Sequence, residues 1–373
     1  MLNKNLTLTI SIVTYNSKHV IAPCLDSIIS TVNNVDYEII VVDNASTDAT
    51  AKYIKNNYPS VTLIANTENI GFGRAHNQAF KNAKGQFFLI LNPDTIIHEN
   101  TIERLIDFMC ETPEATLCGC KIYWDDNKGF QFPDLKLHNL MTAILHFTPF
   151  LLHFPKSHAA KTYWQTAYKF WAATKPIEVE AITGGFMLIK SNVYETIAGF
   201  DEGFFLFFEE HDLMRRINKA GYKIYYLPDV SIQHYFEESC RHSSMDIGKI
   251  YTQSAFYYYK KHYGTFGTLF IRSLFKLNKI IQRQKAKGKM LSKYEKKGFQ
   301  RLTPNSNGDI VIESKQPSFI VEIAYSPEFA DRGGMFVNNS MLTLNNNILN
   351  RLPNNKGFLR IFSTDEIYIL SQM

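Results

Sequence analysis

The sequence predicts an α/β protein with a mostly parallel central sheet and helices on both faces. Strand-like and helix-like segments alternate along residues 6–123, which is the rhythm of βαβ units. The run FFLIL at 87–91 is uninterruptedly apolar, as is typical of a strand covered on both faces. Asn92, Pro93 and Asp94 follow this run. Because Pro93 cannot continue the hydrogen-bond ladder, we expect Asp94 just beyond the carboxyl end of the strand, the edge where ligands bind in open α/β sheets.

The individual elements follow from periodicity and from turn or cap residues. Strands are expected at 6–14, 38–43, 61–65, 87–92, 117–123, 178–190 and 222–227. Helices are expected at 17–32, 47–57, 71–84, 100–111, 209–220 and 251–289, with Ser46 or Thr47 capping the second. Beyond residue 304, short β-like runs at 309–313, 318–324 and 358–362 predict a separate β-rich unit.

These elements suggest three consecutive parts of the chain. Residues 1–245 form the α/β domain, and an aromatic insertion at 127–175 interrupts its rhythm near the expected acceptor side. Residues 246–303 form a basic helical segment, and residues 304–373 form the β-rich appendage.

Composition narrows the class of protein. The chain has 373 residues, 45% hydrophobic and 20% charged, which fits a globular protein with a sizeable core. Its five cysteines are odd in number and lack zinc-site spacing, so we expect reduced thiols in a cytosolic protein. The N-terminal residues show no signal-peptide pattern, and no apolar stretch is long enough to span a membrane.

Positive charge is concentrated in one segment. Residues 260–301 contain thirteen Lys or Arg against a single acid, Glu295, whereas the net charge of the whole chain is only +5. Such a segment suits nucleic acid, anionic lipid headgroups or a solvated helix face. Because no recognised nucleic-acid motif accompanies it, we expect contact with an anionic membrane rather than with nucleic acid.

Polar clusters follow the first two predicted strands. Thr14, Tyr15 and Asn16 follow the first strand, and the acids Asp43 and Asp48 flank the loop after the second. Carboxylates, amides and an aromatic face suit a nucleotide base and its ribose. Ordinary helix capping is the alternative, above all for the loop ending at Asp48.

Two further clusters lie at predicted helix starts. Residues 66–77 contain Gly71-Phe72-Gly73-Arg74, in which glycines allow a close backbone approach and an arginine could reach a phosphate, although the G-x-G-x-x-G fingerprint is absent. Glu209 and Glu210 follow an aromatic tract at 204–208, which would desolvate a carboxylate and raise its pKa as a general base requires. Acids that merely complement the helix dipole are the alternative.

Taken together, these segments resemble the family 2 inverting glycosyltransferases with a GT-A fold, and most of all the rhamnosyltransferase-like members. The segments that carry the resemblance are SIVTYNS, VVDNASTD, NIGFGRAHNQA, LILNPDT, ITGGFMLIK, GFDEGFFLFFEEHDLMRR and a late histidine, His234. They occur in the family's order and cover residues 6–240. The family's processive members carry a Gln-x-x-Arg-Trp motif that this chain lacks, so the resemblance implies single additions.

The resemblance also implies residue roles. Nucleotide-sugar binding is implied for Thr14, Tyr15, Asn16, Asp43, Asp48, Asn69, Gly71, Arg74, Asn92 and Asp94. Contacts with the donor sugar or acceptor are implied for Gly184, Gly185, Phe186 and Asp212. Glu210 stands in the place of the catalytic base, with Glu209 beside it as the other candidate. Asp94 and His234 are the implied ligands of Mg²⁺ or Mn²⁺.

The implied reaction moves a sugar, with L-rhamnose favoured, from a dTDP- or UDP-sugar to a hydroxyl of a cell-surface or lipid-linked saccharide. This would place the protein in cell-envelope polysaccharide or lipopolysaccharide biosynthesis, in the cytoplasm at the inner face of the cytoplasmic membrane. The chain departs from the family twice, with Asn92 in place of the first acid of the D-x-D motif and Glu210 in place of an aspartate. Two alternatives therefore stay open: a nucleotide-sugar-binding protein without catalysis, and a nucleotidyltransferase.

Overall fold

A computed structural model describes most of the chain, in two compact units. It describes residues 7–124, 128–131, 137–147, 169–171, 173–234, 245–286, 300–302, 305–306, 309–313, 319–324, 332–337, 341–344, 356–361 and 366–371. Unit 1 comprises residues 1–122, 135–138 and 174–268, and unit 2 comprises 123–134, 139–173 and 269–373. Most of the predicted aromatic insertion at 127–175 lies outside the described residues.

The central sheet of unit 1 begins with a parallel half in the order β3-β2-β1-β4. These strands are Thr62–Ala65, Tyr37–Asp43, Leu8–Thr14 and Phe87–Leu91. All residues of β1 and β4 are buried, which confirms the interpretation of their apolar runs as strands covered on both faces. The register pairs Thr14 with Asp43 and Asp43 with Ala65, so the carboxyl ends of three strands lie level at one edge.

The other half of the sheet continues as β8-β6-β9-β5, with β7 beside β9. Its strands are Phe186–Lys190, Ala115–Tyr123, Lys223–His234, Thr95–Ile97 and Ile177–Val179. β8 runs antiparallel to β4 and to β6, and β5 and β7 run antiparallel to β9. The single strand predicted at 178–190 is thus two strands, β7 and β8, which a turn containing Gly184 and Gly185 separates.

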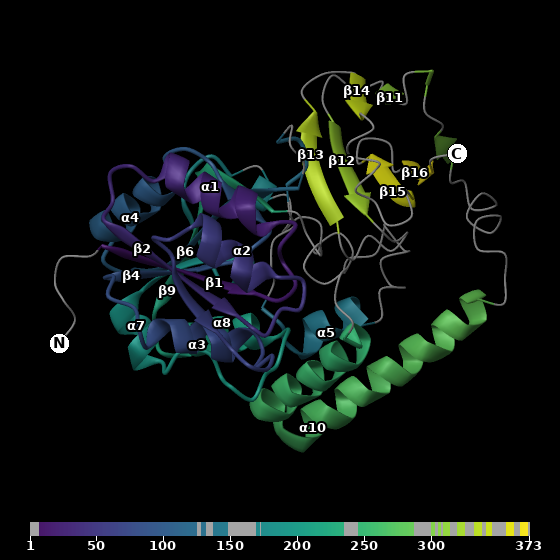
Figure 1. Cartoon of the computed structure of the whole chain (residues 1–373). Coiled ribbons are helices and arrows are strands. Elements are labelled where there is room, and N and C mark those ends of the chain that lie inside the picture. The colour runs from purple at the N-terminus through teal and green to yellow at the C-terminus, as the bar shows by residue number, and fades with distance from the viewer. Residues whose placement is uncertain are drawn as a thin grey trace. The chain divides into compact units, whose positions relative to one another are not determined.

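Helices cover both faces of this sheet (Figure 1), so the predicted fold class is confirmed. Figure 1 shows α1, α2 and α4 on one face and α3, α7 and α8 on the other. Their bounds are Ile21–Thr31, Thr50–Asn57, Thr101–Glu111, Phe72–Phe80, Ser191–Thr196 and Glu209–Lys219. The core that they enclose is aliphatic and aromatic, with Phe88, Ile90, Met187 and Leu213 at its centre.

The helix predicted at 251–289 corresponds to α10, which spans Ile247–Ala286, whereas residues 300–302 at the end of the segment predicted to be helical form a strand, β10. The backbone of α10 breaks at Gly264, whose φ of 64° is a conformation that glycine adopts without steric cost. Residues of α10 up to 268 belong to unit 1, and those from 269 belong to unit 2. Within the described residues, no helix is both long enough and apolar enough to cross a lipid bilayer.

The described residues of unit 2 form helix α5, the second part of α10 and two small sheets. Helix α5 spans Leu140–Phe147. A five-stranded sheet has the order β10-β16-β15-β12-β13, and β11 pairs with β14 in a second sheet. The bounds of these strands are β10 Gln300–Leu302, β11 Ile310–Glu313, β12 Phe319–Ala324, β13 Arg332–Val337, β14 Met341–Leu344, β15 Lys356–Ile361 and β16 Glu366–Ser371. The β-rich character predicted beyond residue 304 is therefore confirmed.

Candidate active site

The loops after β1 and β2 are joined by side-chain hydrogen bonds. The hydroxyl of Thr14 donates to Oδ1 of Asp43 at 2.8 Å, and the same buried carboxylate accepts from the backbone N–H and the hydroxyl of Ser46. The N–H of Thr47 donates to Oδ1 of Asn16 at 2.8 Å. The structure thus brings Thr14, Asn16 and Asp43 together as expected, but it commits the Asp43 carboxylate to bracing its own loop. Tyr15, which belongs to the first of these loops, is half-buried.

Asp48 organises the start of α2. Its carboxylate accepts from the N–H of Lys18 and from both the N–H and the hydroxyl of Thr50. Partial burial raises the pKa of Asp48, but the hydrogen bonds from Thr50 and Lys18 outweigh it and hold that pKa below its usual value. α2 begins three residues later than predicted, because Ala49 has a φ of 67° and Asp48 caps the turn instead of Thr47.

The glycine motif at the start of α3 holds the loop that leads to α8. Oδ1 of Asn69 accepts from the N–H of Gly71, whose φ is 92°. A Cβ on Gly71 would lie 2.5 Å from the carbonyl oxygen of Phe205, so only glycine fits there. Nε of Arg74 donates to the carbonyl of Glu202 at 2.9 Å, and its side chain remains half-exposed.

Asn77, on the same helix, is a residue that sequence reasoning missed. Its amide nitrogen donates to the carbonyl of Phe200, and its oxygen accepts from the N–H of Phe200 and from the hydroxyl of Tyr194. The only signal in the sequence was its position three residues after Arg74. Because residues 200–208 lead directly into α8, Asn77 fixes the approach to the predicted base.

Asp94 and His234 meet at the end of β4. Asp94 lies after Pro93 and is buried, and the pairing of β5 with β9 sets Thr95 opposite His234. Nε2 of His234 lies 3.1 Å from Oδ1 of Asp94 and 3.2 Å from Nδ2 of Asn92. The three residues that the sequence grouped at this edge are therefore in direct contact.

The Asp94 and His234 pair fits a divalent cation. Two adjacent ligands of an octahedral Mg²⁺ or Mn²⁺ lie about 3.0 Å apart, given metal–ligand distances of about 2.1 Å. The observed separation of 3.1 Å between Oδ1 and Nε2 matches that geometry. No group of three His, Cys, Asp or Glu side chains that could hold a metal forms among the described residues, so the remaining ligands would be water and substrate oxygens.

The Gly184-Gly185 turn lies between this pair and the predicted base. The N–H of Asn92 donates to the carbonyl of Gly185 at 2.9 Å. A Cβ on Gly185 would lie 2.8 Å from Cε1 of His234, and a Cβ on Gly184 would lie 3.0 Å from Cγ of Glu210. One turn without side chains thus touches Glu210 on one side and His234 on the other. Phe186, which follows, is buried in β8.

The two glutamates at the start of α8 have different environments. Glu209 is buried, and Oε2 has no hydrogen-bond partner among the described residues, whereas 20% of the Glu210 side chain is exposed. Burial, and then the charge of Glu210, raises the pKa of Glu209 well above its usual value. Burial raises the pKa of Glu210 to about 7. Glu210 is therefore the carboxyl that can both meet an acceptor and change its protonation near neutrality, which favours it over Glu209 as the base.

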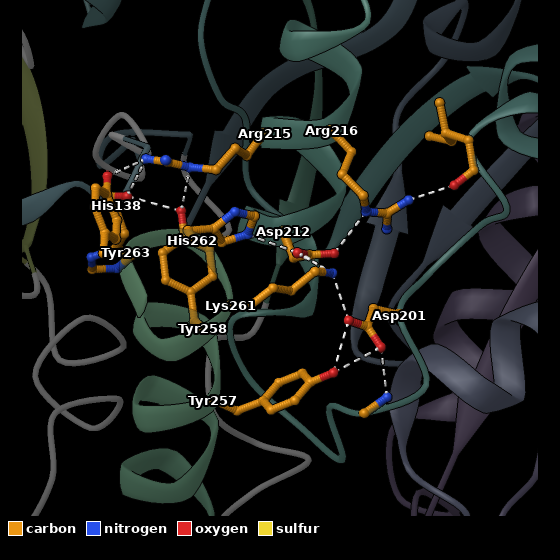
Figure 2. Close-up of polar contacts among 12 residues, drawn as sticks. His138, Asp201, Asp212, Arg215, Arg216, Tyr257, Tyr258, Lys261, His262 and Tyr263 are labelled. Atoms are coloured by element: carbon orange, nitrogen blue, oxygen red, sulfur yellow. Dashed lines mark hydrogen bonds and ion pairs between the residues drawn. The ribbon is translucent and has the colours of Figure 1, made fainter. Parts of the chain in front are cut away.

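Two residues after Glu210, the carboxylate of Asp212 is surrounded by Arg216, Lys261 and His262 (Figure 2). It accepts from Arg216 at 2.8 Å, from Lys261 at 2.6 Å and from Nε2 of His262 at 2.8 Å. Burial raises the pKa of Asp212, but the bonds from His262, Lys261 and Arg216 outweigh it and lower that pKa to about 2. Asp212, which was expected to contact the donor sugar or the acceptor, thus pairs with Arg216 and Lys261 of the protein itself. Its contact with substrate stays a prediction.

Lys261 and Arg215 extend this network, and both were missed from sequence. Figure 2 shows Lys261 reaching Asp201 as well as Asp212. Arg215 donates to the hydroxyls of Tyr258 and Tyr263 and to the carbonyl of His138. The first part of α10 therefore clamps α8, the helix that carries Glu210, so its Lys261 does not simply face solvent or membrane.

A comparison with protein families identifies the chain. The model of the family described as "Glycosyl transferase family 2" matches residues 9–195, which contain the parallel half of the sheet except Leu8, together with Asn92, Asp94 and the glycine turn. The chain belongs to glycosyl transferase family 2. The predicted family is thereby confirmed, and with it the class of protein, a glycosyltransferase. A second model, described as "N-terminal domain of galactosyltransferase", matches residues 167–242, which contain Glu210 and His234.

The chain is also similar to named relatives and to solved structures. The chain is 28% identical over 214 residues to the N-acetylglucosaminyl-diphospho-decaprenol L-rhamnosyltransferase of Mycobacterium tuberculosis, covering 53% of this chain and 66% of that protein. It is 26% identical over 209 residues to the rhamnosyltransferase WbbL of Escherichia coli K12, covering 53% of this chain and 73% of that protein. The mannosyltransferase PcManGT of Pyrobaculum calidifontis, solved with GDP-Man and Mn²⁺, aligns with a TM-score of 0.44 at 17% identity, covering 73% and 74%.

Proposed function

We propose that this family 2 member transfers a sugar from a nucleoside diphosphate sugar to an acceptor hydroxyl, with inversion and with Glu210 as the general base. The observation that carries the proposal is the Gly184-Gly185 turn, which contacts Glu210 on one side and the Asn92 and His234 side chains on the other. A sugar lying over this turn would have a carboxylate on one side and a diphosphate-binding edge on the other. In-line displacement needs that arrangement.

In this reaction Glu210 takes the proton of the acceptor hydroxyl as its oxygen attacks the anomeric carbon. A new bond forms between that oxygen and the carbon, and the bond from the carbon to the diphosphate oxygen breaks. Glu210 suits the role because its partly exposed carboxylate is reachable and its pKa of about 7 matches a base working near neutrality. Glu209 lies buried beside it, and burial and the charge of Glu210 raise the pKa of Glu209.

A divalent cation completes the proposed site. Asp94 and His234 would hold Mg²⁺ or Mn²⁺ through Oδ1 and Nε2, and the cation would replace the contact that Nδ2 of Asn92 makes with Nε2. When bound, the cation supplies positive charge that neutralises the departing diphosphate. Because Asn92 replaces a carboxylate, we expect this site to need a higher metal concentration than a site with two acids.

The donor and acceptor follow from the loops and from the relatives. Tyr15, Asn16 and the Asp43 loop would bind the nucleotide, with Arg74 and Asn69 at the phosphate side, and a dTDP- or UDP-sugar is proposed as donor. Two relatives are named as rhamnosyltransferases, which supports L-rhamnose. One of those names specifies a diphospho-decaprenol acceptor, which supports a lipid-linked or cell-surface saccharide acceptor. Such a role belongs to cell-envelope polysaccharide synthesis at the inner face of the cytoplasmic membrane.

The test is a transfer and donor-hydrolysis assay with dTDP-rhamnose and UDP-sugars in the presence of Mn²⁺. We expect Glu210→Gln to lower kcat at least about a hundredfold with little change in donor KM, as loss of a general base does. Glu111→Gln is the matched control, because that side chain is an exposed glutamate on α4. Full activity of Glu210→Gln would disprove the assignment of the base.

One observation favours a second candidate function. Asn92 contributes an amide where the family has an acid, which suits a protein that binds nucleotide sugars without turning them over. Donor-dependent stabilisation with no hydrolysis or transfer by the wild type would support that candidate. Release of inorganic diphosphate instead of a nucleoside diphosphate would support a nucleotidyltransferase.

A further inference from the structure

The part of α10 that belongs to unit 2 has two opposite faces. Ile271 and Leu274 are buried, and the ring of Phe275 packs against Phe147 of α5 with centroids 4.8 Å apart. These positions repeat at three- and four-residue spacing and form the core-facing side of the helix.

The opposite face carries an exposed apolar row. Leu269, Leu277 and Ile280 are 58%, 42% and 55% exposed, and they fall at i, i+8 and i+11 along one side of the helix. Ser273 fills the gap in this row, and its hydroxyl donates back to the carbonyl of Leu269. Large aliphatic side chains aligned and exposed in this way mark an interaction surface.

A basic row runs along one edge of the apolar row. Arg272, Lys276 and Lys279 are exposed and fall at i, i+4 and i+7. The sequence has no Asp or Glu between residues 247 and 294. The charge that this helix carries between Leu269 and Ile280 is therefore of one sign.

We infer that this face of α10, between Leu269 and Ile280, is a docking surface for the anionic headgroup layer of a membrane. The apolar row would enter the boundary between headgroups and acyl chains, and the basic row would lie against lipid phosphates. A uniformly anionic surface matches charge of a single sign, whereas a protein partner usually presents both signs. Nucleic acid would leave the aliphatic row in water, since its backbone offers phosphates and not an apolar layer.

This inference rests on the proposed function only for the reason why the protein would bind a membrane. Transfer to a lipid-linked acceptor requires the enzyme to work at a bilayer, and an interfacial helix would keep it there. The surface itself is argued from the exposure and the spacing of the helix residues, so it can be tested without any glycosyl transfer.

The experiment is co-sedimentation of the full-length protein with vesicles of phosphatidylcholine mixed with phosphatidylglycerol, and with vesicles of phosphatidylcholine alone. The wild type is expected to bind the mixed vesicles, and more weakly in high salt. Lys276→Gln with Lys279→Gln should weaken binding about thirtyfold, since each basic residue near such a surface contributes about fivefold. Leu277→Gln with Ile280→Gln should also weaken binding, and the factor should be the same in low salt as in high salt.

Matched controls separate this surface from general effects. Lys52→Gln with Lys55→Gln removes two exposed charges from α2, and Ile29→Gln removes a hydrophobic side chain that is 47% exposed on α1. Both controls should bind as the wild type does. Donor hydrolysis should be unchanged in all these variants, so a failed membrane proposal is distinguishable from a failed enzymatic one.

Three results would overturn the inference. The first is wild-type protein that stays in the supernatant with both kinds of vesicle. The second is equal binding by the α10 variants and their controls. The third is a variant with Leu277→Gln and Ile280→Gln whose assembly in solution has a lower mass than that of the wild type. That result would assign this face to contact between copies of the chain.

Discussion

Nζ of Lys261 lies 2.6 Å from Oδ1 of Asp212, a carboxylate with no exposed surface. Replacing Lys261 by Met should destabilise the protein by about 2 kcal/mol, because a buried charge loses one of its partners while Arg216 and His262 remain. Urea unfolding measures this change. Lys260→Met is the control, since Lys260 is the exposed neighbour. In an Asp212→Asn background the effect should shrink, and an undiminished effect would mean that Lys261 acts through Asp201 or through packing and not through Asp212.

The pH dependence of activity should report Glu210. Its carboxylate form is the base, and burial raises its pKa to about 7. We therefore expect kcat/KM to rise with pH up to about 7 and then to level off, because the limb reports the free enzyme's base. The measurement is kcat/KM across pH at saturating Mn²⁺. An unchanged limb in the residual activity of Glu210→Gln would assign the limb to another group.

The same raised pKa makes a prediction about stability. A carboxyl with a pKa near 7 when folded and about 4.3 when unfolded binds its proton more tightly in the folded state, so stability falls as pH rises between these values. Glu210→Gln should therefore be more stable than the wild type by on the order of 2 kcal/mol at about pH 8, and equal to it at about pH 4. Denaturant unfolding at both pH values tests this. Glu111→Gln should show no such difference.

The two glycines of the β7–β8 turn should fail in different ways when replaced by alanine. At Gly184 the new Cβ would press on Cβ and Cγ of Glu210, so kcat should fall and the pH limb should move. At Gly185 it would lie 2.8 Å from Cε1 of His234, so the Mn²⁺ concentration for half-maximal activity should rise. Gly248→Ala is the control, because the nearest atom would be 3.7 Å away. Identical defects in both variants would show a general distortion instead.

Loss of the Asn77 side chain should affect stability and catalysis together. Asn77→Ala removes three hydrogen bonds to Phe200 and Tyr194, which should cost about 2 kcal/mol of unfolding free energy. It should also lower kcat, because residues 200–208 lead into Glu210. Asn82→Ala serves as control, since the Asn82 side chain bonds to the carbonyl of Gln78 within its own turn. Unfolding curves and kcat are the two measurements, and unchanged kcat would remove Asn77 from the catalytic frame.

The sequence carried the fold where local signals decide it. The apolar runs of β1 and β4 and the helix starts at α3 and α8 are properties of short segments, and they were predicted within a few residues. The direction of β8 was not, because an apolar run shows a strand without showing how it pairs. β9 extends to His234, beyond the end predicted at residue 227, and it contains Pro228, which a strand tolerates where the ladder does not need its N–H.

The candidate site was predictable in its location and less so in its contacts. The strand pattern predicted Asn92 and Asp94 at one edge of the sheet, the family resemblance implied His234 as their partner, and the structure places the three in contact. The partners of Arg74 and Asp212 come from residues 202 and 261–262, distant in sequence, and no local pattern shows such pairs. Which polar groups remain open to a ligand therefore depends on tertiary contacts that a single sequence does not contain.

The clamp between α8 and the first part of α10 has a consequence for where this protein can be cut. A fragment ending at residue 245, the expected boundary of the α/β domain, would contain every predicted site residue and the whole match to the family model. It would also lack Lys261 and His262. Of the three partners of the Asp212 carboxylate, only Arg216 would then remain. The smallest autonomous enzyme should therefore extend past Tyr263, because the helix beyond the recognised domain supplies the counter-charge that keeps the base in place.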